Sequence, residues 1–481
     1  MFILDHNAPE PLYVQLSRQI RECVLSGKMP ADSKLPSVRD LAAELSVSRN
    51  TVESTYLELH AEGFIYARPR SGYFVSTLDR GLVPPVSRPR PRGPGSPNLA
   101  DAPPQARPVF LYDFHPARLD HESFPAPLWR KYYLESLRDH SPALAGYGEM
   151  QGLQRLRVCI QEYLERSRGV VCSPDQVVIC AGLQHALSIV AGLFRQSRPR
   201  VAVENPGYFL PRLVLRNHGM EAVPVPVRSG GMDLDALRQS GCSVAYVTPS
   251  HQFPLGHVIP VENRLKLIEW ATEEGHAVIE DDYDSELRYQ GEPIPSLQGL
   301  SPGGNIFYMG TFSKILSPAL RLSYMVLPQA TLPEYRRLFG DYQSSSSLLE
   351  QSTLARFMEH GHWERHIRRV RTGCKKKHDA LLRAIGRHFG DSADIIGQGA
   401  GLHVVLRLSG VSIGERELVD RAGEAGIRLF PFSETLDGGG GDSNMLLLGF
   451  GAMQPEEIDR GVELLSRVCS GRPVEPFAAG R

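Results

Sequence analysis

The chain has 481 residues, and its 53 Lys and Arg against 54 Asp and Glu give a formal net charge of −1. This length predicts several domains, and the hydrophobic and charged fractions of 42% and 22% exclude a disordered or fibrous chain. The balanced charge excludes a polybasic nucleic-acid coat, so any DNA binding requires a local surface.

The start of the chain, its apolar runs and its cysteines all indicate a cytoplasmic protein. Asp5 and Pro9 interrupt the start of the chain, and no apolar run approaches the roughly 18 residues of a membrane span, so we expect neither a signal peptide nor a transmembrane helix. The seven cysteines are scattered without a CxxC pair. We therefore expect a reduced, cytoplasmic protein without a disulfide framework or a metal site.

The N-terminal part shows three helical patterns of apolar residues, 12–24, 38–45 and 52–59. Ser37 and Ser48 stand where the second and third helices need an N-cap. Two short β runs, 64–66 and 73–75, flank a polar turn. Three helices followed by a hairpin predict a winged helix-turn-helix over residues 1–77.

The third helix begins with small polar side chains, which suit hydrogen bonds to phosphates and base edges in a major groove. The candidate DNA-binding residues are Ser48, Arg49, Asn50 and Thr51 at this helix start, Arg39 on the second helix, and Arg68, Arg70 and Gly72 on the wing. The alternative is that they are caps and ordinary surface residues, since residues 1–77 hold eight Lys or Arg and nine Asp or Glu. Their placement, not their net charge, favours DNA binding.

One segment differs from the rest in composition. Residues 78–108 contain nine prolines and five arginines, a composition typical of an extended spacer, which would reach roughly 95 Å. The alternative is a long surface loop within one domain, which is uncommon. We expect a linker here, a large domain over 109–472 and a tail over 473–481.

The large domain alternates β runs with helical patterns, which predicts an α/β fold with a mostly parallel sheet. The β runs are 177–180, 201–203, 244–247, 277–279 and 306–309. Ligands bind at the carboxyl ends of such strands, where Asp281, Tyr283, Lys314 and Tyr208 follow, with Arg321 further on and a helix opening at Leu183.

An amine, an acid, a phenol, a guanidinium and a helix N-terminus together suit pyridoxal 5′-phosphate (PLP). Each has a simpler interpretation alone. Lys314 would be a surface lysine, the run 281–284 a metal site or a solvated turn, and Tyr208 a core aromatic. Their occurrence after successive strands favours the cofactor.

Two resemblances support these interpretations. The segment LPSVRDLAAELSVSRNTVESTYLELHAEGFI resembles the GntR-type winged-helix signature, which implies binding to double-stranded DNA. The segments YGEMQGLQRLR, ENPGY, TPSHQFPLG, IEDDYDSELRY and GTFSKILSPALRLSY resemble a fold-type I (class I) aminotransferase over residues 110–470. Together the two parts resemble the MocR subfamily of transcriptional regulators.

The second resemblance implies a role for each site residue. Lys314 is the Schiff-base lysine, Asp281 pairs with the pyridine nitrogen, Tyr283 bonds the phenolate oxygen and Tyr208 stacks on the ring. The main chain of Leu183 and Gln184, with Thr311 and Arg321, holds the phosphate. Tyr147 reaches the site of a partner subunit in a homodimer.

Two departures from the aminotransferase pattern bear on activity. Aminotransferases place an asparagine where Pro249–Gln252 stands here, and the regulator subfamily commonly has this form. Aminotransferases also carry an arginine near the last core strand for the substrate carboxylate, and 444–450 contains none. Arg428 lies earlier in the chain and is expected at a strand edge.

Three functions follow as hypotheses. The first, which we favour, is a PLP-binding transcriptional regulator, not an enzyme, that senses PLP or an amine or amino-acid effector and binds an operator with repeated half-sites. The second is an active aminotransferase with an accessory N-terminal domain. The third is a DNA-binding protein whose large domain serves only for dimerisation.

Overall fold

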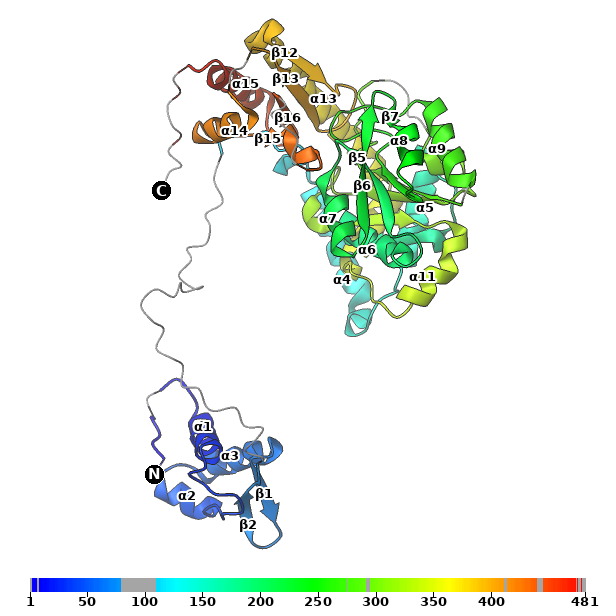
Figure 1. The fold of residues 1–481 in the computed structure, drawn as a ribbon. Coiled ribbons are helices and arrows are strands. Elements are labelled where there is room, and N and C mark those ends of the chain that lie inside the picture. The colour runs from blue at the N-terminus through cyan, green and yellow to red at the C-terminus, as the bar shows by residue number, and fades with distance from the viewer. Residues whose placement is uncertain are drawn as a thin grey trace. The chain divides into compact units, whose positions relative to one another are not determined.

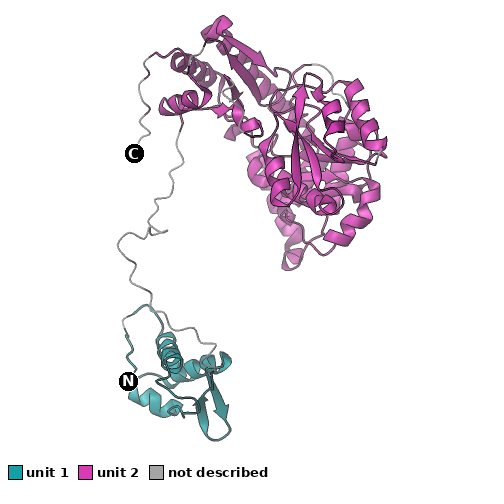
Figure 2. Ribbon diagram, in the orientation of Figure 1, with its two compact units in different colours: residues 1–106 teal, residues 107–481 magenta. Residues whose placement is uncertain are grey.

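The computed structural model describes residues 2–6, 8–78, 110–273, 275–290, 295–410, 413–438, 444–472, 474 and 477. The chain divides into two compact units, residues 1–106 and 107–481 (Figure 2). Apart from Leu78, the linker expected at 78–108 lies outside the described residues. The same holds for the tail expected at 473–481, apart from residues 474 and 477.

The first unit has three helices and a hairpin: α1 (Leu12–Leu25), α2 (Val38–Glu44), α3 (Arg49–Ala61), β1 (Ile65–Arg68) and β2 (Gly72–Val75) (Figure 1). Its buried cluster includes Leu16, Ile20, Val52 and Tyr56, all at most 1% exposed. These residues recur three or four positions apart, which places them on the inner helix faces. The predicted winged helix-turn-helix is confirmed.

The hairpin is longer than predicted. Arg68 pairs with Gly72 in the antiparallel ladder, so these two residues end the strands instead of forming the turn. The turn consists of residues 69–71, and Arg70 adopts a left-handed conformation with φ of 61°. The wing is therefore a narrow projection.

The second unit contains an eight-stranded sheet in the order β4-β11-β10-β9-β8-β5-β6-β7. These strands are β4 (Val177–Cys180), β5 (Arg200–Asn205), β6 (Glu221–Arg228), β7 (Gly231–Met232), β8 (Val244–Val247), β9 (Ala277–Asp282), β10 (Ile306–Thr311) and β11 (Ser323–Val326). The ladders joining β10, β9, β8, β5 and β6 are parallel. Those made by β11 and β7 are antiparallel. The fold is of the predicted fold-type I aminotransferase class.

Helices cover both faces of this sheet (Figure 1). The helices of this part of the chain are α4 (Ala126–His140), which packs on α12, α5 (Gln154–Arg168), α6 (Leu183–Phe194), α7 (Phe209–Asn217), α8 (Leu234–Gln239), α9 (Val261–Glu273), α10 (Leu297–Leu300), α11 (Leu332–Phe339) and α12 (Leu348–Glu359). Alternate strand residues enter different cores. Val177 and Ile179 join one cluster, and Val178 and Cys180 join another. Burial on both faces explains the continuous β-branched runs of the sequence.

A smaller sheet follows the long helix α13 (His362–Phe389). Its strand order is β12-β13-β16-β15, with β12 (Ala393–Ile396), β13 (His403–Leu408), β15 (Phe430–Pro431) and β16 (Met445–Gly449). Helices α14 (Glu415–Glu424) and α15 (Pro455–Cys469) accompany it, and β14 (Ile427–Arg428) pairs with β3 (Tyr112–Asp113).

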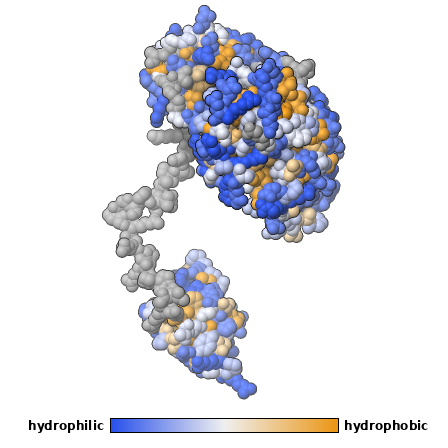
Figure 3. All heavy atoms as spheres, turned by 45° about the vertical axis from the view of Figure 1, so that its right-hand side comes forward, coloured by the Kyte–Doolittle hydropathy of each residue, from blue (hydrophilic) through white to orange (hydrophobic). Residues whose placement is uncertain are grey.

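The surface view agrees with two globular units that carry polar residues outside. On the face in Figure 3, hydrophilic residues cover most of the large unit with apolar patches between them, and polar and apolar residues are mixed on the small unit. Within the described ranges no helix is both long and apolar enough to cross a membrane. The seven cysteines are all free thiols.

Candidate functional sites

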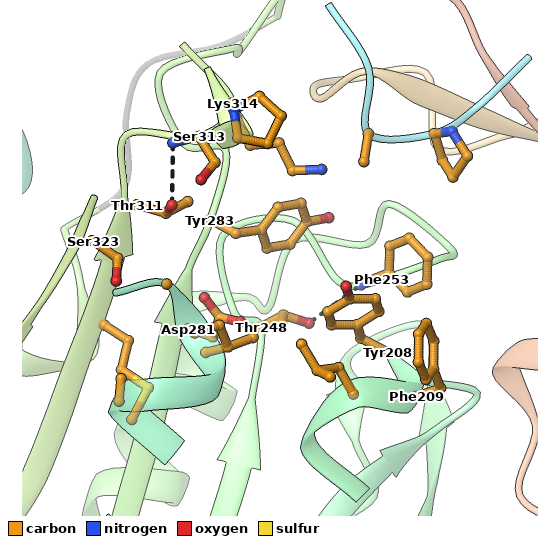
Figure 4. Close-up of a pocket in the computed structure, with 18 of the residues that line it drawn as sticks. Tyr208, Phe209, Thr248, Phe253, Asp281, Tyr283, Thr311, Ser313, Lys314 and Ser323 are labelled. Carbon is orange, nitrogen blue, oxygen red and sulfur yellow. Dashed lines mark hydrogen bonds between the residues drawn. The ribbon is translucent and has the colours of Figure 1, made fainter. Parts of the chain in front are cut away.

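A cavity of about 390 Å³ opens at the carboxyl ends of β8, β9 and β10. Figure 4 shows the Lys314 side chain above the ring of Tyr283, with Asp281, Thr248 and Tyr208 beneath. The lining residues that the sequence predicted are Leu183, Tyr208, Asp281, Tyr283, Thr311, Lys314 and Arg321. Residues from distant parts of the sequence thus surround one space.

Lys314 follows β10 and reaches into this cavity. Its Nζ lies 5.7 Å from the centroid of the Tyr283 ring. In the described part of the chain it has no hydrogen-bond partner. Burial lowers the pKa of the amine, and the carboxylates of Asp284 and Asp281 oppose that shift. A buried amine with a lowered pKa has an increased neutral, nucleophilic fraction.

Asp281 and Asp282 are neighbours on β9 that face opposite sides of the sheet. The Asp281 carboxylate lines the cavity and accepts a hydrogen bond from the Tyr246 hydroxyl. Burial raises its pKa to about 7, although the Tyr246 hydrogen bond lowers it. Asp282 instead pairs with Arg168 at 2.7 Å and accepts from Tyr308 at 2.6 Å. These partners outweigh burial and hold the Asp282 pKa below its ordinary value.

This arrangement corrects the position predicted for the acidic run. Glu280, Asp281 and Asp282 belong to β9, and Thr311 to β10, instead of following those strands. The simpler interpretation of 281–284 as a solvated turn is wrong, because Asp281, Asp282 and Asp284 are buried, and strand alternation gives Asp281 and Asp282 different partners. No group of three or more potential metal ligands occurs among the residues described.

Tyr283 and Asp284 share a buried histidine that sequence reasoning did not assign. His251 Nδ1 lies 2.8 Å from Asp284 Oδ2 and 3.0 Å from the Tyr283 hydroxyl. His251 and Gln252 are buried outside the cavity lining, whereas Phe253 lines it and meets the Tyr208 ring edge-on at 5.5 Å. The residue that follows Pro249–Gln252 thus forms an aromatic wall beside Tyr208.

The N-terminus of α6 forms one end of the cavity with Thr311, Ser313 and Arg321. Arg321 Nη2 donates to the carbonyl of Ala181 at 3.1 Å. A Cβ on Gly182 would lie 1.9 Å from that nitrogen, so this close approach of Arg321 to the main chain requires glycine.

Two predicted site residues do not place their side chains in the cavity. The Gln184 side chain is exposed outside the lining, and its main chain lies in the first turn of α6. Tyr147 is 88% exposed and does not line the cavity of its own chain.

A further wall of the cavity, which we call the second-sheet wall, was not predicted. The second sheet contributes Phe430, Pro431 and Leu447 to it, the short helix after β15 contributes Glu434 and Thr435, and the segment after β3 contributes His115, Pro116 and Ala117. Leu447 lies at the middle of β16, the strand that lacks the expected arginine. Burial lowers the pKa of His115 to about 4, so its ring is neutral at pH 7.

Arg321 is the only guanidinium among the described lining residues. Arg428 lies outside that lining, 3.7 Å from Asp113.

The side chains present fit PLP. The cofactor needs an amine, an acid for its pyridine nitrogen and donors for its phosphate. Among the described residues Lys314 is an amine without a hydrogen-bond partner, and it shares one cavity with the buried carboxylate of Asp281. Helix α6 and Arg321 supply donors at one end.

In the first unit the predicted DNA-binding residues have different environments. The Ser48 hydroxyl accepts from the Thr51 N–H at 3.1 Å and lies 2.8 Å from the Thr51 hydroxyl, so both side chains serve the cap of α3. Arg39, Arg49 and Asn50 are exposed. On the wing, Arg68 bonds Asp32 at 3.2 Å and lies over the Phe74 ring at 4.4 Å. Arg70 occupies the turn, and Gly72 has φ of 104°.

Comparisons with known proteins match both units. Residues 12–75 match the family model for bacterial regulatory proteins of the gntR family, and residues 118–464 match that for aminotransferase class I and II. The structure is similar to LysN, the α-aminoadipate aminotransferase of Thermus thermophilus complexed with N-(5′-phosphopyridoxyl)-L-leucine. The TM-score is 0.68 and the identity 27%, over 76% of this chain and 93% of that one.

Two relatives share the architecture along its length. The chain is 37% identical to the uncharacterized HTH-type transcriptional regulator YdeL of Bacillus subtilis, over 96% of this chain and 97% of the relative. It is 33% identical to the probable rhizopine catabolism regulatory protein MocR of Rhizobium meliloti, over 97% and 95%. The chain therefore belongs to the MocR-type transcriptional regulators of the GntR family, in which a winged helix-turn-helix is joined to an aminotransferase-like domain.

Proposed function

We propose that the cavity binds PLP and that Lys314 holds it covalently. When bound, this cofactor supplies an aldehyde that condenses reversibly with primary amines and a pyridine ring that accepts electrons. The observation that carries the proposal is that the Lys314 amine and the buried Asp281 carboxylate face one cavity. Burial favours the neutral form of Lys314, which is the form that attacks an aldehyde.

The other lining residues have separate tasks in this proposal. Asp281 keeps a proton on the pyridine nitrogen, because a nearby cation stabilises its ionised form. Tyr283 donates to the phenolate oxygen and Tyr208 stacks on the ring. The N–H groups of Leu183 and Gln184, with Thr311 and Arg321, bind the phosphate.

We propose that this site senses a small molecule and does not turn over amino acids. At the second-sheet wall, the α-carboxylate of an amino acid would meet the apolar Leu447 and the neutral ring of His115. It would also meet Glu434, whose charge has the same sign as its own. A bidentate guanidinium contact is missing from the lining that the structure describes. These features favour PLP itself, or an amine without an α-carboxylate, as the effector.

We further propose a cytoplasmic homodimer that binds an operator with two repeated half-sites. Exposed apolar side chains on and after α4 support a second copy as their cover: Leu134, Leu137, Leu144, Tyr147 and Met150. Several exposed large apolar side chains in one stretch of chain are a feature that interfaces bury. In the dimer, Tyr147 reaches the partner's cofactor site.

Reduction with borohydride tests the cofactor assignment. The full-length protein incubated with PLP and reduced should carry the cofactor on the peptide containing Lys314, and Lys314→Ala should carry none. Lys266→Ala, at an exposed lysine of α9, is the matched control and should label like the wild type. Equal labelling of Lys314→Ala would refute the assignment.

An assay for repeated turnover of amino acids distinguishes the proposed regulator from an active aminotransferase. Incubation of the PLP-loaded protein with a panel of amino acids and 2-oxoglutarate should yield no more than one equivalent of product per site. Repeated turnover would favour the active aminotransferase instead. Absence of any covalent cofactor would favour a dimerisation scaffold.

A further inference from the structure

Helix α13 is strongly basic although the whole chain is nearly neutral. Its 28 residues include nine Lys or Arg against two acids, Glu364 and Asp379. Lys377 is buried and pairs with Asp120. The other eight basic side chains are exposed: Arg365, Arg368, Arg369, Arg371, Lys375, Lys376, Arg383 and Arg387. The helix thus concentrates positive charge on its outer surface.

Seven of these eight side chains make no ion pair with a carboxylate among the described residues; only Arg387 does, with Asp459 at 2.9 Å. We call these seven the basic face: Arg365, Arg368, Arg369, Arg371, Lys375, Lys376 and Arg383. Arg365, Arg369 and Arg371 donate to main-chain carbonyls. The remaining four have no partner in the described part of the chain.

Exposed arginines elsewhere on this unit commonly do find acids. Arg200 pairs with Glu221 at 3.0 Å and Arg216 with Asp437 at 2.9 Å. On α13, Glu364 and Asp379 stand three or four residues from Arg368, Lys375, Lys376 and Arg383, but no ion pair joins them among the described residues. Other neighbours at this spacing are like charges, such as Arg365 with Arg369 and Arg371 with Lys375. Like charges at this spacing destabilise a helix. A bound polyanion would relieve that repulsion.

The basic face is long, and Asp379 lies between Lys376 and Arg383 on the same side of the helix. Buried residues such as Trp363, Val370 and Leu381 hold the inner side of the helix, so the basic side chains share the outer side. Arg365 and Arg383 are 18 residues apart, which corresponds to about 27 Å along the axis. That length matches about eight base pairs of duplex DNA at 3.4 Å each.

We propose that the basic face of α13 binds the phosphate backbone of operator DNA outside the bases contacted by the winged helices. The inference rests on the proposed binding of an operator by this regulator. Charge complementarity favours DNA as the occupant, since duplex DNA is a dense polyanion. DNA bound by the first unit is also at high effective concentration for the second, because both belong to one chain.

The test neutralises the four unpartnered residues in the full-length protein. The variant R368Q/K375Q/K376Q/R383Q is compared with the wild type for binding to an operator selected from random duplexes by the full-length protein. The dissociation constant is measured over a series of salt concentrations. Each lost phosphate contact lowers the slope of log K against log salt by about 0.9, so the slope should fall by roughly two to four.

A matched control carries the same change of charge elsewhere. R195Q/R238Q/K266Q/R336Q removes four exposed positive charges from three other helices and the end of a fourth and should keep the wild-type slope. Equal slopes for the two variants would overturn the proposal. So would a variant that loses binding to vesicles of anionic lipid but keeps its full affinity for DNA.

A non-specific duplex separates this inference from the proposed function. The same neutralisation should weaken binding to that duplex, because phosphate contacts do not depend on sequence. If the wild type fails to discriminate the operator from the non-specific duplex, the proposed function fails, while the salt slopes on the non-specific duplex still decide the role of α13.

Discussion

At the scale of single residues, neighbouring carboxylates have opposite environments. Asp281 faces the cavity with a pKa raised to about 7, and Asp282 faces a buried arginine that keeps its pKa low. The raised value has a consequence for stability. The folded protein without cofactor retains a proton on Asp281 at pH values where the unfolded chain, with a pKa of about 3.9, has lost it.

We therefore expect Asp281 to make the cofactor-free protein less stable as pH rises. Its stabilising contribution is complete below about pH 4 and is lost by about pH 7, at no more than about 1.4 kcal/mol per pH unit. In thermal denaturation of the large unit, the wild type should lose stability relative to Asp281→Asn over this range. The difference between the two should then stay constant.

Saturation with PLP provides the control for that measurement. A pyridinium beside Asp281 stabilises its ionised form, so the pH-dependent difference between wild type and variant should shrink in the loaded protein. A difference that does not depend on pH in the cofactor-free protein would contradict the raised pKa.

At the scale of elements, the residues at the start of α3 that cap the helix differ from those that remain free to contact DNA. Ser48 and Thr51 bond each other at the N-cap, so their hydroxyls stabilise the helix. Arg49 is exposed beside them and has no hydrogen bond or ion pair in the described ranges. We assign to Arg49 the direct contact with a base edge or a phosphate.

Arg49→Ala should weaken operator binding by roughly 1–3 kcal/mol without changing the PLP spectrum or the melting temperature of the first unit. Titration of a labelled operator at physiological salt measures this loss. Arg18→Ala, at an exposed arginine on α1, is the matched control and should bind like the wild type. Unchanged binding by Arg49→Ala would exclude this docking of α3.

At the scale of the whole molecule, two DNA-binding units joined to one dimeric body would bind two half-sites together. The second contact then forms at a high effective concentration. The cluster that fills the first unit draws only on residues of that unit, which supports its study in isolation. We expect residues 1–78 alone to bind one half-site weakly and without a response to PLP.

Operator affinity of the full-length protein and of residues 1–78, each with and without PLP, tests this coupling. The full-length protein should bind more tightly, and its affinity should change with PLP, because an effector shifts an equilibrium only when it binds the two arrangements differently. Equal affinities, or the same PLP response from the short fragment, would rule out the tethered mechanism.

Most of the architecture was predictable from the chain alone. Periodic apolar residues and the capping serines located the helices of the first unit, and buried runs such as 177–180 and 244–247 coincide with β4 and β8. Strand ends were less accurate, because a run of carboxylates is unfavourable in a strand until buried partners such as Arg168 and Tyr308 are known. Strands β6 and β11, each next to the last strand at one end of the sheet, were missed, since strand pairing is a long-range contact.

The sequence by itself determined the two-part organisation and the residue types around Lys314, because local periodicity and strand ends are encoded in neighbouring residues. Only the tertiary structure decided which side chains share the cavity. Packing of distant segments brings His251 to the hydroxyl of Tyr283 and Phe253 to the ring of Tyr208. It also places Leu447 in the lining of the cavity that contains Lys314. The same holds for α13, whose lysines and arginines are visible in the sequence, whereas their exposure and lack of acidic partners depend on what the folded chain places around them.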